Sequence, residues 1–262
     1  MHDLATCFLA LYLAHLLTDF VLQSDRLVAQ KRAGSVLAYT RHGAVHLVAS
    51  LVLLAVALPG LAERPDLYGL IAGLTLVHLG IDRGKAQLVR SNSAWDGAKV
   101  FLADQVLHGI TVGITAWLLI RPPLPNLSSS FAGFRPHVEK TLLVLVVYVG
   151  IIFGGGYLIR SLTKLLVKED LGITGQTTNE MQNAGLYIGW LERFLVLTAL
   201  VLHSPATVGL ILTAKSIARY PEFKSVRFAE YFLIGTLLSV SLGIVGGLIL
   251  LKTLYGTVTL SN

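Results

Sequence analysis

The sequence predicts an all-α, polytopic transmembrane helix bundle with seven to eight membrane segments. Its composition is the first reason: 54% of the 262 residues are hydrophobic and 14% are charged, with a mean hydropathy of +0.69, whereas soluble domains carry about 25% charged residues. The second reason is that long apolar stretches recur along the whole chain and do not alternate with polar residues as β-barrel strands do. These observations argue against a disordered chain, an ordinary cytosolic enzyme and a secreted disulfide scaffold, since the chain has one cysteine, Cys7.

The apolar stretches give the expected order of elements, because about 20 apolar residues span a bilayer. We expect spans near residues 4–23, 43–62, 67–82, 99–120, 139–161, 185–203 and 228–253, and a shorter segment at 205–218 that tilts or re-enters. The first span is not a cleavable signal peptide, because it lacks a basic start and contains His15 and Asp19. The spans divide into a four-helix bundle over residues 1–122 and a distal bundle over residues 138–262, without a separate soluble domain.

The placement of lysine and arginine predicts the orientation of the bundle. Most of the 21 basic residues fall in four segments between spans: Arg26, Lys31, Arg32 and Arg41; Arg83, Lys85, Arg90 and Lys99; Arg160, Lys164 and Lys168; and Lys215, Arg219, Lys224 and Arg227. If 205–218 counts as a membrane segment, all four lie on one side, which the positive-inside rule makes the cytoplasm, and both termini lie on the other side. The expected location is a bacterial inner membrane, where the chain could form a homo-oligomer. Topology and anionic lipid head groups then explain the net charge of +6, and no nucleic-acid partner is expected.

Ionisable residues inside transmembrane segments are costly and mark functional sites, and here they come in four pairs. In each pair the two residues are four positions apart, so both side chains stand on one helix face, one turn from each other. The pairs are His15 and Asp19, His42 and His46, His78 and Asp82, and Asp104 and His108. Because successive spans run in opposite directions, we expect all four pairs at one depth, in the cytoplasmic leaflet.

All eight residues of these pairs are the predicted metal ligands, since imidazole and carboxylate together suit zinc, manganese or iron. Zinc is the first choice, and the set is large enough for one ion or two. Asp82 and Asp104 are also candidates for a catalytic base, and Gln105 for a group that orients the substrate. The alternative interpretation is a hydrogen-bonded core of histidines, but four pairs at one depth favour the metal site.

In the distal half, Glu192 and Arg193 lie inside an apolar run. Neighbours on a helix point about 100° apart, so each needs a partner elsewhere: Lys215 or Arg219 for Glu192, and Glu230 for Arg193. One interpretation is a structural ion pair that locks the short segment 205–218 against its neighbours. The other is a cationic cradle, made of Arg193, Lys215 and Arg219, that holds the phosphate or carboxylate of a substrate head group.

The paired residues resemble those of bacterial membrane proteins described as predicted metal-dependent hydrolases, including the LexA-regulated inner-membrane group. The opening His15-Leu-Leu-Thr-Asp19-Phe-Val-Leu-Gln23-Ser-Asp25 is more closely similar to the family called domain of unknown function 3307. Three distal segments also resemble this family: Ile188-Gly-Trp-Leu-Glu192-Arg193, Ala214-Lys215-Ser216-Ile-Ala-Arg219 and Glu230-Tyr231-Phe-Leu-Ile-Gly235-Thr236. The resemblance implies membership over most of the chain and a metal-dependent hydrolase activity, and it implies nothing about the substrate.

Three functions are compatible with these features. The first is a metal-dependent hydrolase that acts at the cytoplasmic leaflet on a lipid or lipid-linked (phospho)ester through a metal-activated water. The second is a di-iron membrane oxygenase, although such families are richer in histidine and have adjacent histidines that this chain lacks. The third is a non-enzymatic transporter or sensor of metal ions or protons. The outer halves of the first four spans hold hardly any ionisable residue, which favours an enzyme or sensor over a conduit.

Overall fold

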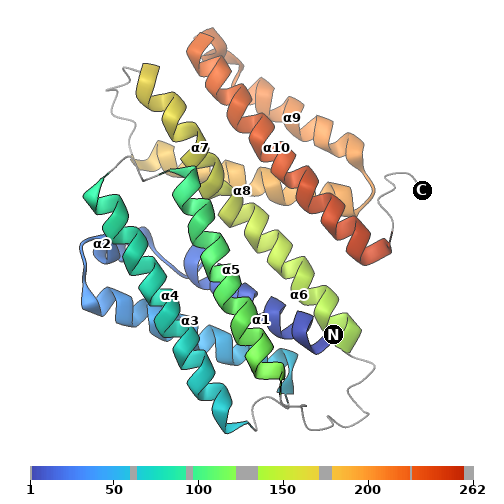
Figure 1. The fold of residues 1–262 in the computed structure, drawn as a ribbon. Coiled ribbons are helices and arrows are strands. Elements are labelled where there is room, and N and C mark those ends of the chain that lie inside the picture. The colour runs from blue at the N-terminus through green and yellow to red at the C-terminus, as the bar shows by residue number, and fades with distance from the viewer. Residues whose placement is uncertain are drawn as a thin grey trace. The chain divides into compact units, whose positions relative to one another are not determined.

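The computed structural model describes residues 2–59, 64–92, 97–121, 135–170, 179–224 and 226–256, and these residues form helices and short turns with no strand among them (Figure 1). The all-α prediction is therefore confirmed. The chain divides into two compact units, Met1–Val149 and Gly150–Asn262. The division predicted from the sequence grouped residues 138–149 with the distal helices, whereas in the structure they pack within the first unit.

The first unit is a helical bundle built around its N-terminal helix. Its helices are α1 (His2–Phe20), α2 (Asp25–Arg32), α3 (Val36–Ala57), α4 (Pro65–Ser91), α5 (Ala98–Ile120) and α6 (Arg135–Val149). Helix α1 packs against α3, α5 and α6, and α4 packs against α3 and α5 (Figure 1). The short helix α2 lies against α3 and α4. The first helix therefore has neighbours on several sides and carries its ionisable pair into the interior.

Helix α2 is an element that the sequence analysis did not predict, although its local signals are present. Ser24 caps its N-terminus by accepting a hydrogen bond from the backbone N–H of Leu27, and Ser35 caps α3 in the same way through Ala38. Between the two helices the backbone of Gly34 has a φ of +84°, which a residue without Cβ adopts most easily. Two serine caps and one glycine turn thus fold α2 back against the bundle.

The polarity of the first unit is inverted relative to a soluble protein. On α3 the side chains of Val45, Val48, Val52 and Val56 are exposed, while the histidines on the same helix are buried. A contiguous apolar outer surface of this kind is rare on soluble monomers and is typical of contact with lipid. The described helices are thus consistent with a bilayer environment.

Five helical stretches of the described residues are long and apolar enough to cross a membrane: Asp3–Phe20, Val36–Ala57, Ala98–Ile120, His137–Thr163 and Phe228–Tyr255. The predicted spans at 67–82 and 185–203 form helices but do not meet this measure, and both helices carry several charged side chains, such as Asp82 and Arg193. Residues 205–218 form an apolar helix that is too short to be included among these five stretches. Residues 60–62 of the second predicted span lie outside the described residues. The total of seven to eight spans and the position of the termini stay predictions.

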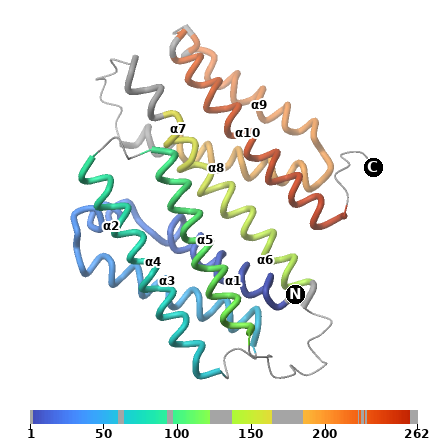
Figure 2. The backbone as a smooth tube through the Cα atoms, viewed as in Figure 1, coloured from blue at the N-terminus to red at the C-terminus, as the bar shows by residue number. Residues whose placement is uncertain are grey.

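The second unit contains a π-helical turn η4 (Gly150–Gly154), α7 (Gly155–Asp170), α8 (Asn179–Val201), α9 (Pro205–Ala218), a 3-10 turn η5 (Tyr220–Lys224) and α10 (Val226–Tyr255). Helix α10 packs along α8 and contacts α7, and α9 packs on α8 (Figure 2). Two glycines four residues apart on α10 lie against α8: a Cβ on Gly243 would come within 2.6 Å of Val196, and one on Gly247 within 2.5 Å of Leu200. This is the close approach that small residues allow between membrane helices.

Because of this close approach, Gly247→Ala is expected to destabilise the second unit. The new Cβ would lie 2.9 Å from the Cβ of Leu200, which the backbone holds in place. Overpacking costs about 1–3 kcal/mol, more than the gain of about 1 kcal/mol that alanine offers over glycine in a helix. Thermal unfolding in detergent measures the change. Gly235→Ala on the same helix is the control, since its Cβ would meet nothing within 4 Å, and an equal loss of stability in both variants would contradict this account.

Candidate metal centre

The four predicted pairs come together inside the first unit. Helices α1 and α4 carry their pairs in their second halves, and α3 and α5 carry theirs in their first halves. All five histidines are 1% exposed and Asp104 is 4% exposed. The prediction that the pairs lie at one level of the bundle agrees with the distances between them, which are given next.

Four donor atoms from α1, α3 and α4 converge most closely. His42 Nε2 lies 2.9 Å from His78 Nε2, 3.2 Å from Asp19 Oδ1 and 3.2 Å from Asp82 Oδ2. His78 Nε2 lies 3.4 Å from Asp19 Oδ1 and 4.0 Å from Asp82 Oδ2. Ligands bound to one tetrahedral ion at about 2.0–2.1 Å stand about 3.3 Å from each other. The spacing of these four atoms therefore fits the ligand set of a single metal ion.

Two further histidines, His15 on α1 and His108 on α5, stack with their ring centroids 4.5 Å apart. His108 Nδ1 donates a hydrogen bond to the backbone carbonyl of Asp104 (3.1 Å), so its Nε2 carries the lone pair, and this buried atom has no hydrogen-bond partner. A nitrogen oriented in this way by a bond from the opposite ring atom is the usual arrangement of a metal-binding histidine. The tautomer of His108 thus suits a ligand.

Gln105 orients His15 in a similar way. The Nε2 group of Gln105 donates to Asp104 Oδ2 (3.1 Å), which turns its Oε1 towards His15 Nε2, 3.4 Å away. His15 Nδ1 then carries the lone pair, has no hydrogen-bond partner and lies 3.7 Å from Asp19 Oδ2. Gln105, which was predicted to orient the substrate, is therefore in contact with the predicted ligand His15.

Two lysines that the sequence analysis used only for topology contact the carboxylates of the cluster. Lys31 Nζ on α2 lies 2.5 Å from Asp82 Oδ2, and Lys85 Nζ on α4 lies 2.7 Å from Asp104 Oδ2. Lys31 is 8% exposed, so its ammonium group is held inside by this bond. Lys85 follows Asp82 by three residues, so the two side chains lie on the same face of α4, and this spacing could have indicated that Lys85 points towards the cluster. The position of Lys31 depends on how α2 folds back, which no local pattern reveals.

Among the described residues, three overlapping groups have ligand atoms that lie within 4.8 Å of one another: His15, Asp19, His78 and His108; Asp19, His42, His78 and Asp82; and Asp82, Asp104 and His108. Seven of the eight predicted ligands belong to these groups. The eighth, His46, lies beside them: its Nδ1 is 3.1 Å from the hydroxyl of Thr75, and its ring stacks on His78 at 4.3 Å. His46 therefore contacts the groups through its ring, by stacking on His78.

In the second unit, the buried Glu192 forms an ion pair with the partly buried Lys215, as the first interpretation expected. Arg193 does not use Glu230 as its partner. Its guanidinium donates to the carbonyl of Ile152 in the π-helical turn, at 3.0 and 2.7 Å, and to the hydroxyl of Ser239 at 3.4 Å. Arg193 thus bonds to the backbone of the turn, and the head-group role of Arg193, Lys215 and Arg219 stays a prediction.

The glycines next to this turn provide the space for Arg193. A Cβ on Gly156 would lie 2.8 Å from Arg193 Nη2, and one on Gly189 would lie 3.3 Å from Nη1. Small residues at these positions therefore let the arginine side chain approach the backbone closely.

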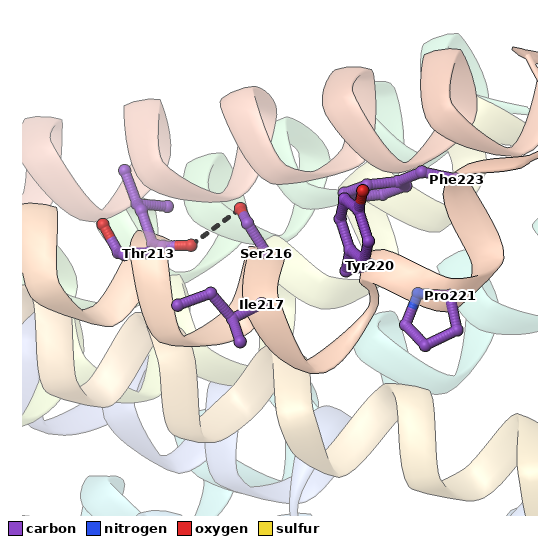
Figure 3. Close-up of a pocket in the computed structure, with 7 residues that line it drawn as sticks. Thr213, Ser216, Ile217, Tyr220, Pro221 and Phe223 are labelled. Carbon is purple, nitrogen blue, oxygen red and sulfur yellow. Dashed lines mark hydrogen bonds between the residues drawn. The ribbon is translucent and has the colours of Figure 1, made fainter.

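An open, mostly apolar hollow lies on α9 and η5 (Figure 3). It is lined by Leu212, Thr213, Ser216, Ile217, Tyr220, Pro221 and Phe223. The lining has no carboxylate, imidazole or ammonium group, so this hollow has no donor set for a metal ion.

Residues 7–135 match the model of a family described as "Protein of unknown function (DUF3307)". The match includes all four His/Asp pairs and ends before the three distal segments, whose resemblance to the family stays an expectation. No curated protein and no solved structure matches the chain.

Proposed function

This chain belongs, through residues 7–135, to the DUF3307 family, and we propose that it is an integral membrane, metal-dependent hydrolase of a lipid or lipid-linked phosphoester. The observation that carries the proposal is the ligand spacing of His42, His78, Asp19 and Asp82 inside a membrane bundle. Two imidazoles and two carboxylates suit zinc first, and manganese or iron next. The proposed location is the bacterial inner membrane, with the site at the cytoplasmic leaflet, the depth at which lipid head groups lie.

A bound divalent ion would lower the pKa of a coordinated water towards ~7 and polarise the scissile ester. Asp104 is the proposed general base. Lys85 and Gln105 both donate to its Oδ2, while its buried Oδ1 has no hydrogen-bond partner. That oxygen is free to accept the proton of the attacking water, as a general base must. Asp82 is better suited to be a ligand, since its oxygens lie 3.2 Å from His42 Nε2 and 3.8 Å from His108 Nε2.

Lys31 and Lys85 support an anionic substrate. Both ammonium groups already contact the carboxylates at the cluster. When a divalent ion neutralises those carboxylates, the ammonium groups become available to phosphate oxygens, which lysine binds as a point charge. A carboxylic ester has no such charge for them to bind. We therefore place phosphate recognition at these two lysines.

A one-sided site favours catalysis over transport. The other end of the first unit is an apolar core, in which Leu11, Leu54, Ile71 and Leu119 are fully buried. A conduit needs polar groups along its whole length. The His/Asp cluster instead ends where this core begins.

Phosphate or head-group release from synthetic phospholipids in mixed micelles, with and without zinc or manganese, tests the proposal. Metal-dependent hydrolysis that the matched carboxylic ester does not undergo is the expected result. Hydrolysis of neither substrate with zinc, manganese or iron would contradict the proposal. Oxygen consumption by the iron-loaded protein, with no hydrolysis, would favour the oxygenase instead.

Lys31→Gln is expected to weaken substrate binding more than the chemical step. The variant loses the charge that would hold the phosphate, so KM should rise by about 10-fold or more, the effect of losing one charge-assisted hydrogen bond worth roughly 1.5–3 kcal/mol. Lys99→Gln is the control, because Lys99 is an exposed lysine in the first turn of α5. An unchanged KM in Lys31→Gln would exclude Lys31 from phosphate recognition.

A further inference from the structure

The His/Asp cluster has more donor atoms than one metal ion uses. Structural and catalytic zinc sites take three or four protein ligands, whereas seven residues here lie in overlapping groups with ligand atoms within 4.8 Å of one another. Buried polar atoms without partners need an explanation, such as an ion. Three such atoms are His15 Nδ1, His108 Nε2 and Asp19 Oδ1. The first two belong to residues that are 1% exposed and lie outside the four-donor set around His42.

Each of two aspartates presents its oxygens to two different histidine pairs. In Asp19, Oδ1 lies 3.2 Å from His42 Nε2 and 3.4 Å from His78 Nε2, while Oδ2 lies 3.7 Å from His15 Nδ1. In Asp82, Oδ2 lies 3.2 Å from His42 Nε2, while Oδ1 lies 3.8 Å from His108 Nε2. Both carboxylates thus stand between the two pairs with one oxygen towards each.

From this arrangement we infer a dinuclear metal centre in which Asp19 and Asp82 bridge two ions. The first ion is held by His42 and His78, and the second by His15 and His108. This inference rests on the proposed function and deepens it. Two-metal sites hold their ions about 3.5–4 Å apart and clamp both the attacking and the leaving oxygen of a phosphoester. At the second position, His15 Nδ1 and His108 Nε2 lie 3.7 and 3.8 Å from the bridging carboxylates, farther than the 3.2 Å between these carboxylates and His42 Nε2. This wider spacing would leave room for a water on the second ion.

With two ions, the charges at the cluster would favour an anionic substrate. Asp19, Asp82 and Asp104 supply three negative charges, and Lys31 and Lys85 return two positive charges at contact distance. Two divalent cations make the site strongly positive, and a phosphate anion together with a metal-bound hydroxide would offset that charge. The pair of ions therefore fits the anionic substrate class better than a neutral ester.

Binding of Mn²⁺ to the full chain in detergent, after removal of bound metal with a chelator, tests the inference. We expect two Mn²⁺ per chain by equilibrium dialysis and an exchange-coupled signal by low-temperature electron paramagnetic resonance. This wild-type measurement needs no variant to fold. One Mn²⁺ per chain with an isolated six-line signal would overturn the dinuclear centre.

Variants on opposite sides of the bridges sharpen the test. His42→Ala and His108→Ala should each retain one Mn²⁺ and each lose the coupling, because they empty different positions. His137→Ala, an exposed histidine on α6, should keep both ions and the coupled signal. Loss of all Mn²⁺ in both His42→Ala and His108→Ala, with both variants folded, would show that they share one ion and would overturn the inference.

The outcomes separate this inference from the proposed function. Phosphoester hydrolysis by a chain that holds one ion overturns the dinuclear centre and keeps the hydrolase. Two coupled ions without hydrolysis overturn the hydrolase and keep the dinuclear centre.

Discussion

Asp82→Asn is expected to abolish metal binding and hydrolysis together. Asp82 Oδ2 lies close to His42 and accepts a hydrogen bond from Lys31, and Oδ1 faces His108. Asparagine keeps the shape of the side chain but removes the charge and turns one oxygen into a donor. Changing a group that merely orients a ligand costs about 10–100-fold in metal affinity or activity, so losing this ligand should cost more. Metal content per chain and kcat/KM on the phosphoester measure the effect.

Asp66→Asn is the matched control, because Asp66 lies on the same helix, is half exposed and pairs with Arg64. We expect its metal content and kcat/KM to stay at the wild-type level. Asp82→Asn also leaves the Lys31 ammonium without its counter-charge, so the double variant with Lys31→Met separates the two effects. The double variant should regain stability but not metal or activity. Full activity in Asp82→Asn would contradict its assignment as a ligand.

Metal removal is expected to lower the thermal stability of the chain strongly. A ligand that binds only the folded state stabilises it by about 4 kcal/mol at 1,000 times its Kd. Without the ion, buried atoms such as Asp19 Oδ1 and His108 Nε2 have no hydrogen-bond partner. Lys31 and Lys85 offset only part of the carboxylate charge. The unfolding midpoint in detergent, with zinc and after chelation, measures the shift.

Zinc should give no such shift in Asp82→Asn, which has lost the site but keeps the rest of the bundle. Equal midpoints for the wild type with zinc, with manganese, with iron and after chelation would contradict the presence of a tightly bound metal.

Local patterns predicted much of the metal centre. The four-residue spacing of each pair and the high hydropathy around it are properties of single helices, so they can be recognised in the sequence without knowledge of the fold. Because successive helices run in opposite directions, His15, His42, His78 and His108 were expected at one level of the bundle. The short distances between their rings agree with that expectation. The same reasoning could not separate His46 from the ligands, because the place of His46 beside the three groups depends on how α3 packs against α4.

What could not be predicted depends on contacts between elements. Lys31 contacts Asp82 because α2 folds back on α3 and α4, and nothing in residues 25–32 specifies that contact. Arg193 was expected to pair with a carboxylate, but its guanidinium donates to the carbonyl of Ile152 in a π-helical turn that the sequence analysis did not predict. The helices at 67–82 and 185–203 carry charges whose partners lie on other elements, so hydropathy alone did not decide whether they cross the membrane.

Metal content is the most direct test of the claim that the His/Asp cluster binds a divalent transition metal. The full chain should be purified in detergent and its metals counted by mass spectrometry, beside His137→Ala and a double variant with His42→Ala and Asp82→Asn. The account predicts bound zinc, manganese or iron in the wild type and in His137→Ala, and its loss in the double variant. No metal in the wild type, even after reconstitution with each of the three ions, would contradict the account and leave a hydrogen-bonded histidine core.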